Sequence, residues 1–190
     1  AALGDKIWKA MFYCFRILNL LTSSWIGWCA HMNKDIKVGI GDMKIARREG
    51  TLITYALGSC VGITLYDPMI KLGALVHILL PEAGGNAAGN IFKFADTGIR
   101  ETLRKMDVFG GVRSRYQCVI AGGAKMFEMS AGIGNIGDRN IKMVEKVLAE
   151  EHIRISAKDV GANYARTLLL DVQTGGVKVR TSGRKEIILR

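Results

Sequence analysis

Cys60 and His77 are the residues of this sequence whose types and spacing are best suited to covalent chemistry. A thiol with its ordinary pKa of about 8.5 is mostly protonated at neutral pH, and an imidazole that accepts its proton creates the nucleophilic thiolate. Such a thiolate attacks an amide carbonyl and forms a thioester, which water then hydrolyses. Gly58 and Ser59 precede the cysteine and predict a sharp bend, whose backbone N–H groups are candidates for binding the oxyanion or the substrate.

Two predicted strands position this pair. The apolar runs 61–66 and 72–80 flank an Asp67-Pro68 dipeptide, which favours the first two positions of a type I turn and therefore a β-hairpin. With the turn centred after Pro68, Cys60 faces His77 directly, with Cβ atoms about 4.5–5.5 Å apart. A one-residue slip in register would separate the two side chains. This register also puts Gly62 and Gly73 on the shared face, where we expect them to leave room for a ligand.

Structural roles compete with the catalytic interpretation. A single cysteine in a strand is commonly a small buried hydrophobe, and a single histidine on an apolar strand is commonly a hydrogen-bonded core residue. The predicted opposition of Cys60 and His77 favours function for the pair. Cys118 lies in another apolar run without such a partner, and we assign it to the core. The four cysteines form no CxxC pair and the three histidines are dispersed, so we expect no metal and no cofactor.

The rest of the chain alternates between strand and helix signals. Glycine and proline mark the turns, and Asp138 is a candidate N-cap for the second helix. Strands are expected at 36–40, 51–57, 61–66, 72–80, 116–121, 153–157, 167–172 and 177–181, and helices at 92–106 and 139–151. Short turns between strands predict an α+β fold, a layered α/β sandwich with a mostly antiparallel or mixed sheet and helices packed outside it.

The first 31 residues differ from the rest. Residues 17–30 form an apolar run that basic residues precede, and Met32 then opens a polar stretch typical of a natural start. We interpret residues 1–31 as an atypical, non-native N-terminal extension upstream of the true start, with a membrane-anchoring or interfacial helix as the alternative. The domain proper is then 32–190.

Net charge and cysteine content limit the classes of binding partner and the cellular compartment. The net charge is +10, from 27 basic and 17 acidic residues, which attracts nucleic acid, anionic membranes or acidic proteins. The basic residues are scattered and no nucleic-acid-binding signature is present, so we expect no nucleic-acid partner. Four cysteines in a chain of 190 residues are too few for a disulfide scaffold, which favours a cytoplasmic location.

Five stretches of the sequence resemble one family, the CheD chemoreceptor glutamine deamidases of bacterial chemotaxis. They follow the family's order and, together, span about 36 to 180. The stretches are TYALGSCV (54–61), GALVHILLP (73–81), AGGAKMF (121–127), NIGDRN (135–140) and GANYAR (161–166).

The resemblance implies a catalytic triad, with Cys60 as nucleophile, His77 as base and Thr54 as the residue that orients the imidazole. It also implies a layered α/β fold, a substrate consisting of specific glutamines on methyl-accepting chemotaxis receptors, and a CheC-type phosphatase as partner. Any contact with the membrane is then indirect, through the receptors. Two alternatives stay open: a non-catalytic module that binds receptor or phosphatase, and a hydrolase of glutamate methyl esters that uses the same site.

Overall fold

The computed structural model of the protein describes residues 34–84, 89–125 and 135–190. The predicted N-terminal extension, part of the predicted loop at 84–90 and the end of the stretch 121–127 lie outside the described residues. The expectation of an α+β layered fold is confirmed, because two helices and two mixed sheets make up the described part of the chain.

The two sheets have five strands each. In the central sheet the spatial order is β2 (Met43–Arg47), β5 (Leu72–Ile78), β4 (Val61–Asp67), β6 (Gln117–Gly122) and β7 (Ile155–Val160). In the outer sheet it is β1 (Asp35–Lys37), β3 (Thr51–Leu57), β8 (Arg166–Asp171), β9 (Val177–Arg180) and β10 (Ile187–Ile188). Only the pairs β1–β3 and β6–β7 are parallel.

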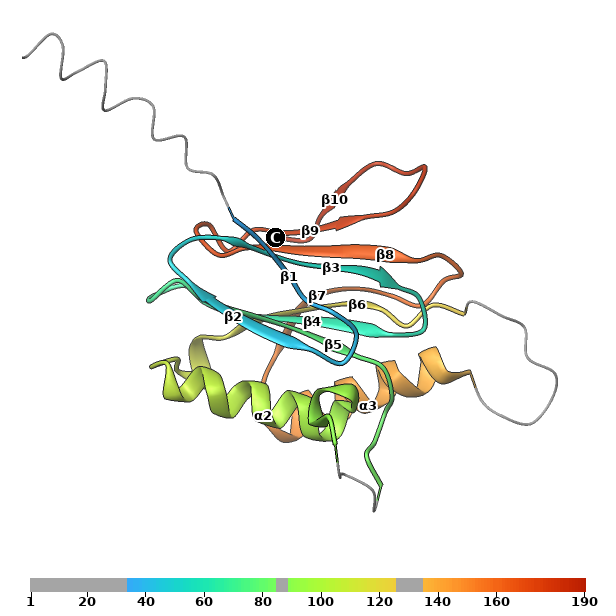
Figure 1. The fold of residues 1–190 in the computed structure, drawn as a ribbon, viewed down its shortest axis with the longest axis horizontal. Coiled ribbons are helices and arrows are strands. Elements are labelled where there is room, and N and C mark those ends of the chain that lie inside the picture. The colour runs from blue at the N-terminus through green and yellow to red at the C-terminus, as the bar shows by residue number, and fades with distance from the viewer. Residues whose placement is uncertain (1–33, 85–88, 126–134) are drawn as a thin grey trace, which may run out of the picture. The chain divides into compact units, whose positions relative to one another are not determined.

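Helices cover one face of the central sheet, and the outer sheet covers the other face, so that three layers result (Figure 1). The helices are α2 (Ala95–Val108) and α3 (Ile136–Glu150), and two short 3-10 turns, η2 (Ile91–Lys93) and η3 (Arg113–Arg115), flank α2. Asn135, not Asp138, is the N-cap of α3, because its side chain accepts a hydrogen bond from the backbone N–H of Gly137. The α3 helix therefore begins three residues earlier than the sequence predicted.

Alternating side chains divide the core into two layers. In β4 and β5 every residue is buried, as expected for strands that are covered on both faces. One set of their side chains packs against the apolar stripes of α2 and α3, and the other set packs against β3 and β8. The space between the sheets is thus an apolar layer, and any polar group within it needs a hydrogen-bond partner.

The hairpin of β4 and β5 closes through a longer loop than the sequence predicted. Asp67 pairs with Leu72, so residues 68–71 form a four-residue loop in which Lys71 has a φ of +49°. A two-residue hairpin loop that fits the strand twist needs positive φ at its first central position. Pro68 cannot occupy that position, because its ring fixes φ near about −65°.

The longer loop shifts the register by two residues. Gly62, and not Cys60, lies directly opposite His77, so the predicted direct pairing is wrong. Because side chains alternate with a period of two, a shift of two residues leaves Cys60 on the same face as His77. This face is the one that looks toward the outer sheet, where Cys60 belongs to the apolar layer between the sheets.

Candidate active site

Thr54 and His77 meet between the two sheets. Thr54 lies on β3 of the outer sheet and His77 on β5 of the central sheet, and both side chains are fully buried. The Thr54 Oγ1 and His77 Nδ1 atoms are 2.7 Å apart, within hydrogen-bonding distance. The imidazole is thus held by a hydroxyl that comes from a different sheet.

A second hydrogen bond determines which nitrogen of His77 carries the proton. The Thr54 hydroxyl donates to the backbone carbonyl of Val38 at 2.8 Å. Since a hydroxyl has a single hydrogen, its oxygen must accept from His77, and Nδ1 is therefore the protonated nitrogen. The other nitrogen, Nε2, is buried and has no hydrogen-bond partner within the described parts of the chain. It is left with a free lone pair, which is the requirement for a general base.

Cys60 lies in the same layer between the two sheets. It directly precedes β4, two residues before the glycine that faces His77, and so is a diagonal neighbour of His77. Such neighbours are about 7–8 Å apart in an antiparallel sheet, within reach of an aromatic ring. Cys60 is 7% exposed, whereas His77 is fully buried. The two described side chains make no hydrogen bond to each other, and in enzymes such bonds frequently tighten only when the substrate binds.

Burial keeps both groups neutral in the resting protein. It raises the pKa of the Cys60 thiol, an effect that the cysteine's own backbone N–H partly offsets. It lowers the pKa of His77 to about 4. Neither change comes from a carboxylate, because the group that holds the imidazole is a neutral hydroxyl. The pair is therefore a thiol beside an imidazole, and the thiolate forms only when His77 accepts the proton.

The turn that carries the nucleophile is held by its backbone carbonyls. Gly58 O accepts from the N–H of Ala124 and Cys60 O accepts from the N–H of Gly123, both at 2.7 Å. The N–H of Gly58 donates to Ala56 O, so this group is not free to bind an oxyanion, in contrast to our expectation. The N–H groups of Ser59 and Cys60 donate to no backbone carbonyl in the described ranges, and they are the remaining candidates.

The glycines on the shared face do not leave space for a ligand. A Cβ on Gly62 would lie 2.8 Å from Leu57 and 3.0 Å from Leu168. A Cβ on Gly73 would lie 2.9 Å from Leu170. Our expectation of an open face is thus wrong, because leucines of the outer sheet fill it. The glycines allow the two sheets to approach, which brings Thr54 within reach of His77.

Three further features of the site were not predicted from the sequence. They are the carbonyl of Val38, the backbone of residues 122–124 and the side chain of Asn140, which donates to Ser59 O at 2.9 Å and to Leu79 O at 3.0 Å. Asn140 belongs to one of the stretches that carry the family resemblance, so a signal for it was present. A backbone carbonyl such as that of Val38 leaves no trace in residue type.

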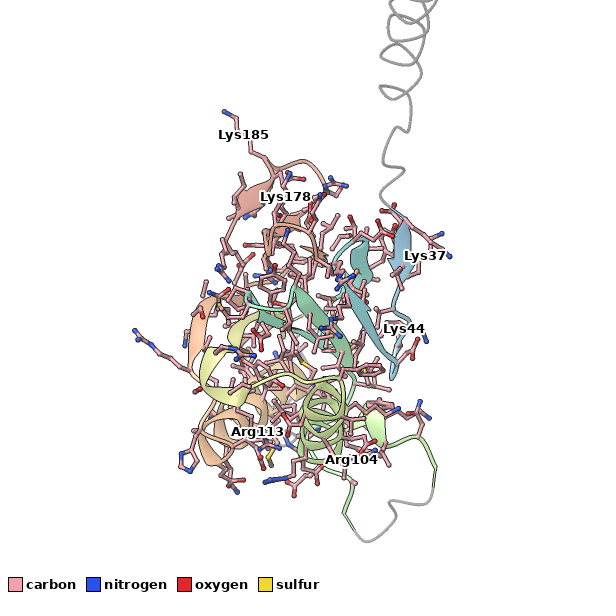
Figure 2. The ribbon with its side chains drawn as sticks, turned by 90° about the vertical axis from the view of Figure 1, so that its left-hand side faces the viewer. Lys37, Lys44, Arg104, Arg113, Lys178 and Lys185 are labelled. Carbon is pink, nitrogen blue, oxygen red and sulfur yellow. The ribbon has the colours of Figure 1, made fainter. Side chains whose placement is uncertain are left out.

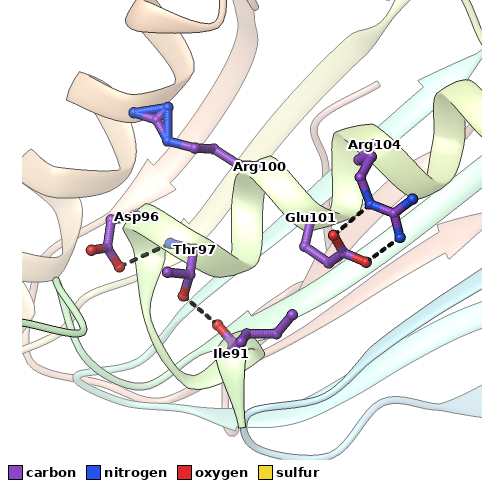
Figure 3. A pocket seen from close by; sticks show the side chains of 6 residues that line it. All are labelled: Ile91, Asp96, Thr97, Arg100, Glu101 and Arg104. Atoms are coloured by element: carbon purple, nitrogen blue, oxygen red, sulfur yellow. Dashed lines mark hydrogen bonds and ion pairs between the residues drawn. The ribbon is translucent and has the colours of Figure 1, made fainter. Parts of the chain in front are cut away.

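A surface hollow lies elsewhere, along the first turns of α2 (Figure 3). Its charged groups already have partners. Arg104 binds Glu101 through two hydrogen bonds of 2.7 Å, Arg100 forms ion pairs with α3 and the residue after it, and Asp96 accepts backbone N–H groups. None of the three triad candidates lines it. The lining residues are Ile91, Asp96, Thr97, Arg100, Glu101 and Arg104.

Within the described residues, no group of three or more His, Cys, Asp or Glu side chains has an arrangement that could hold a metal ion. Neither α2 nor α3, the helices of the described part of the chain, has the length and apolar character that crossing a membrane requires.

Comparison with known proteins identifies the family. The family described as "CheD chemotactic sensory transduction" matches residues 79–181. This range begins after His77, so the match is independent of the three triad candidates. Among solved structures, the hypothetical protein YfiH of Bacillus licheniformis covers 70% of this chain and 60% of its own, with a TM-score of 0.40 and 13% identity, a similarity too weak to inform fold or function.

Three relatives are named "Probable chemoreceptor glutamine deamidase CheD". The relative from Syntrophomonas wolfei is 45% identical over 83% of this chain and 100% of its own length. The relative from Desulforamulus reducens is 45% identical over 80% of this chain and 93% of its own length. The relative from Pyrococcus abyssi is 42% identical over 78% of this chain and 93% of its own length. Identity of this degree over nearly the whole length of each relative is decisive, and the chain belongs to the CheD family.

Proposed function

We propose that this protein hydrolyses the side-chain amides of specific glutamines on methyl-accepting chemotaxis receptors, giving glutamate and ammonia. The observation that carries this proposal is the 45% identity to relatives named as chemoreceptor glutamine deamidases. The hydrogen bond between Thr54 and His77 beside a nearly buried Cys60 supports the chemistry.

In the proposed first half-reaction, His77 Nε2 takes the proton of the Cys60 thiol as the sulfur attacks the amide carbon of the glutamine. The carbonyl oxygen becomes an oxyanion, for which the N–H groups of Ser59 and Cys60 are the candidate donors. The C–N bond then breaks, the leaving amine takes the proton from His77, and ammonia departs. A thioester between Cys60 and the substrate side chain remains.

In the second half-reaction, water replaces the amine. His77 removes a proton from the water molecule, and the hydroxide attacks the thioester carbon. The C–S bond breaks, the proton returns to the sulfur, and glutamate is released. Thr54 keeps Nδ1 protonated throughout, so that Nε2 is the nitrogen that exchanges protons in both half-reactions.

The biological setting follows from the substrate. Receptor glutamates formed in this way can be methylated, so the proposed role is in chemotaxis adaptation. We propose a cytoplasmic location, where the signalling helices of the receptors lie, and a CheC-type phosphatase as a regulatory partner.

Mass spectrometry of receptor fragments tests the proposal. After incubation with the wild-type protein, we expect glutamine-containing peptides to gain the small mass difference between –NH₂ and –OH. Cys60→Ala should abolish this change, whereas Cys118→Ala should keep it, because Cys118 is a fully buried core residue of β6. Deamidation that persists in Cys60→Ala would refute the mechanism, and its absence in the wild type would refute the activity.

A further inference from the structure

Asn140 links the nucleophile turn to the strand that carries the base. It is the fifth residue of α3, and it is fully buried. One atom of its side chain lies 2.9 Å from Ser59 O and 3.0 Å from Leu79 O. Because both neighbours are acceptors, that atom is the amide nitrogen. Ser59 precedes the candidate nucleophile, and Leu79 lies two residues after His77.

All three carbonyls of the nucleophile turn have a donor. The N–H groups of Ala124 and Gly123 hold the first and the third, on Gly58 and Cys60. The middle one, on Ser59, is held by the side chain of Asn140. It is the only one of the three contacts that a side chain makes, since the other two donors belong to the backbone.

The middle carbonyl also fixes the direction of a candidate oxyanion donor. In a planar trans peptide, the C=O and the N–H point in opposite directions. With the Ser59 carbonyl directed at α3, the N–H of Cys60 points away from the helix. This N–H also lowers the pKa of the cysteine's own thiol, as a donor close to the sulfur does. When the sulfur attacks a carbonyl carbon, the oxygen on that carbon develops its negative charge close to the same N–H group.

We propose that Asn140 is a positioning residue, which holds the Ser59 carbonyl so that the Cys60 N–H is aimed at the oxyanion formed when Cys60 is acylated. The inference rests on the proposed function in one respect, that Cys60 is the nucleophile. The second hydrogen bond of Asn140, to Leu79 O, ties this turn to the end of the strand that carries His77. The amide oxygen of Asn140 accepts no hydrogen bond from the described residues.

Two reactions at the same sulfur separate this role from a general structural role. Iodoacetamide is attacked at its CH₂ carbon, a C–S bond forms and iodide leaves, so no oxyanion develops. p-Nitrophenyl acetate is attacked at its carbonyl carbon and passes through a tetrahedral oxyanion before p-nitrophenolate leaves. Only the second reaction requires a correctly aimed N–H group.

The decisive variant is Asn140→Leu, which has a similar volume but no donor. We expect the rate of Cys60 acylation to fall about 10- to 100-fold, less than or comparable to the loss of a whole oxyanion donor. The rate of Cys60 alkylation should stay within about twofold, since that reaction lacks the oxyanion. Cys60→Ala supplies the background from the other cysteines, and peptide mapping confirms the modified residue.

Asn135→Ala is the matched control. It removes the N-cap of the same helix but leaves the Ser59 contact in place. We expect it to lower the melting temperature without changing the ratio of acylation to alkylation. If Asn140→Leu does not fold, Asn140→Ala removes the two hydrogen bonds with a smaller side chain and is assayed in the same way.

Three outcomes would overturn the inference: an unchanged acylation rate in the folded Asn140 variant, an equal fall of both rates, or a wild-type Cys60 that is not acylated. The proposed function fails separately. Suppose that Cys60 is acylated and Asn140→Leu acts as expected, yet the protein deamidates no receptor fragment. The positioning role of Asn140 would then stand, and the proposed receptor substrate would be refuted.

Discussion

Each of the three residues of the candidate triad has a different environment. Thr54 is neutral and buried. Its hydroxyl donates to a backbone carbonyl and accepts a hydrogen bond from the imidazole, which fixes the orientation of the ring. No carboxylate contributes to the shift of His77, whose pKa burial alone lowers to about 4. Cys60 retains some contact with solvent. The base is thus held by a hydrogen bond inside the protein, and the nucleophile is the more exposed of the two.

Replacing Thr54 with valine tests the orienting hydroxyl. Valine keeps the shape but leaves Nδ1 without its partner, so both tautomers become available to His77. We expect kcat to fall about 10- to 100-fold with little change in KM, the range typical when the hydrogen-bond partner of a metal-binding histidine is removed. Thr54→Ser, which restores the hydroxyl, should recover most of the rate. Equal rates for the valine and serine variants would show that the hydroxyl has no role.

The buried imidazole also predicts how stability depends on pH. The pKa of His77 is about 4 in the folded protein and 6.5 as its ordinary value. Between these values the unfolded chain binds more protons, so the free energy of unfolding decreases as the pH falls from 6.5 toward 4. The loss from this residue is on the order of 3 kcal/mol. Urea unfolding of wild type and His77→Asn at several pH values measures it, and equal pH dependence in both proteins would contradict it.

Among the structural elements, the β3–β4 connection is the one that creates the site. It passes from the outer sheet to the central sheet, and the backbone N–H groups of Gly123 and Ala124, which directly follow β6, hold its carbonyls in place. Gly122 has a φ of +111°, and a Cβ at this position would lie 2.2 Å from Cys60 O. Both the conformation and the close approach require glycine. The end of β6 thus determines where the nucleophile lies.

Gly122→Ala should therefore displace the nucleophile as well as destabilise the protein. We expect the strained backbone to cost about 1–3 kcal/mol, and the overlap with Cys60 to abolish most of the activity. Gly110→Ala is the control, because Gly110 has a φ of +87° but nothing within 4 Å of an added Cβ. It should show the strain without the loss of activity. Measuring both kcat and thermal unfolding for each variant separates the loss of stability from the displacement of the nucleophile. An active Gly122→Ala would argue against this role of β6.

For the whole molecule, charge is the property most relevant to partner binding. The net charge is +10, and the basic side chains labelled in Figure 2 come from several different elements. Several of them form ion pairs, such as Arg113 with Asp107 and Glu151. The positive charge therefore belongs to the protein as a whole, and we expect it to attract an acidic surface of the proposed receptor substrate.

Ionic strength tests this attraction. Salt shortens the screening length from about 10 Å at 0.1 M to about 3 Å at 1 M, so long-range steering disappears over this range. We expect kcat/KM for receptor fragments to fall several-fold, and Cys60 acylation by the neutral ester to change little. A receptor reaction that is insensitive to salt would show that the positive charge serves another purpose.

The amino-acid sequence by itself determined that Cys60 and His77 share a face. Strand side chains alternate with a period of two, so this conclusion survived a register error of two residues in the hairpin. It also determined the α+β class and most of the strands, because apolar runs between glycine and proline turns are local signals. It did not predict β2, or the two-residue β10, whose side chains are exposed.

Only the tertiary structure decided what surrounds the pair. The contact of His77 with Thr54 spans 23 residues, and the contacts of Asn140 with Leu79 and Ser59 span 61 and 81. The family resemblance, and not any local pattern, singled out Thr54 before the structure placed it. Contacts between two sheets and a helix depend on how these layers pack against each other. The periodicity of side chains along one strand or helix does not determine how close the layers lie.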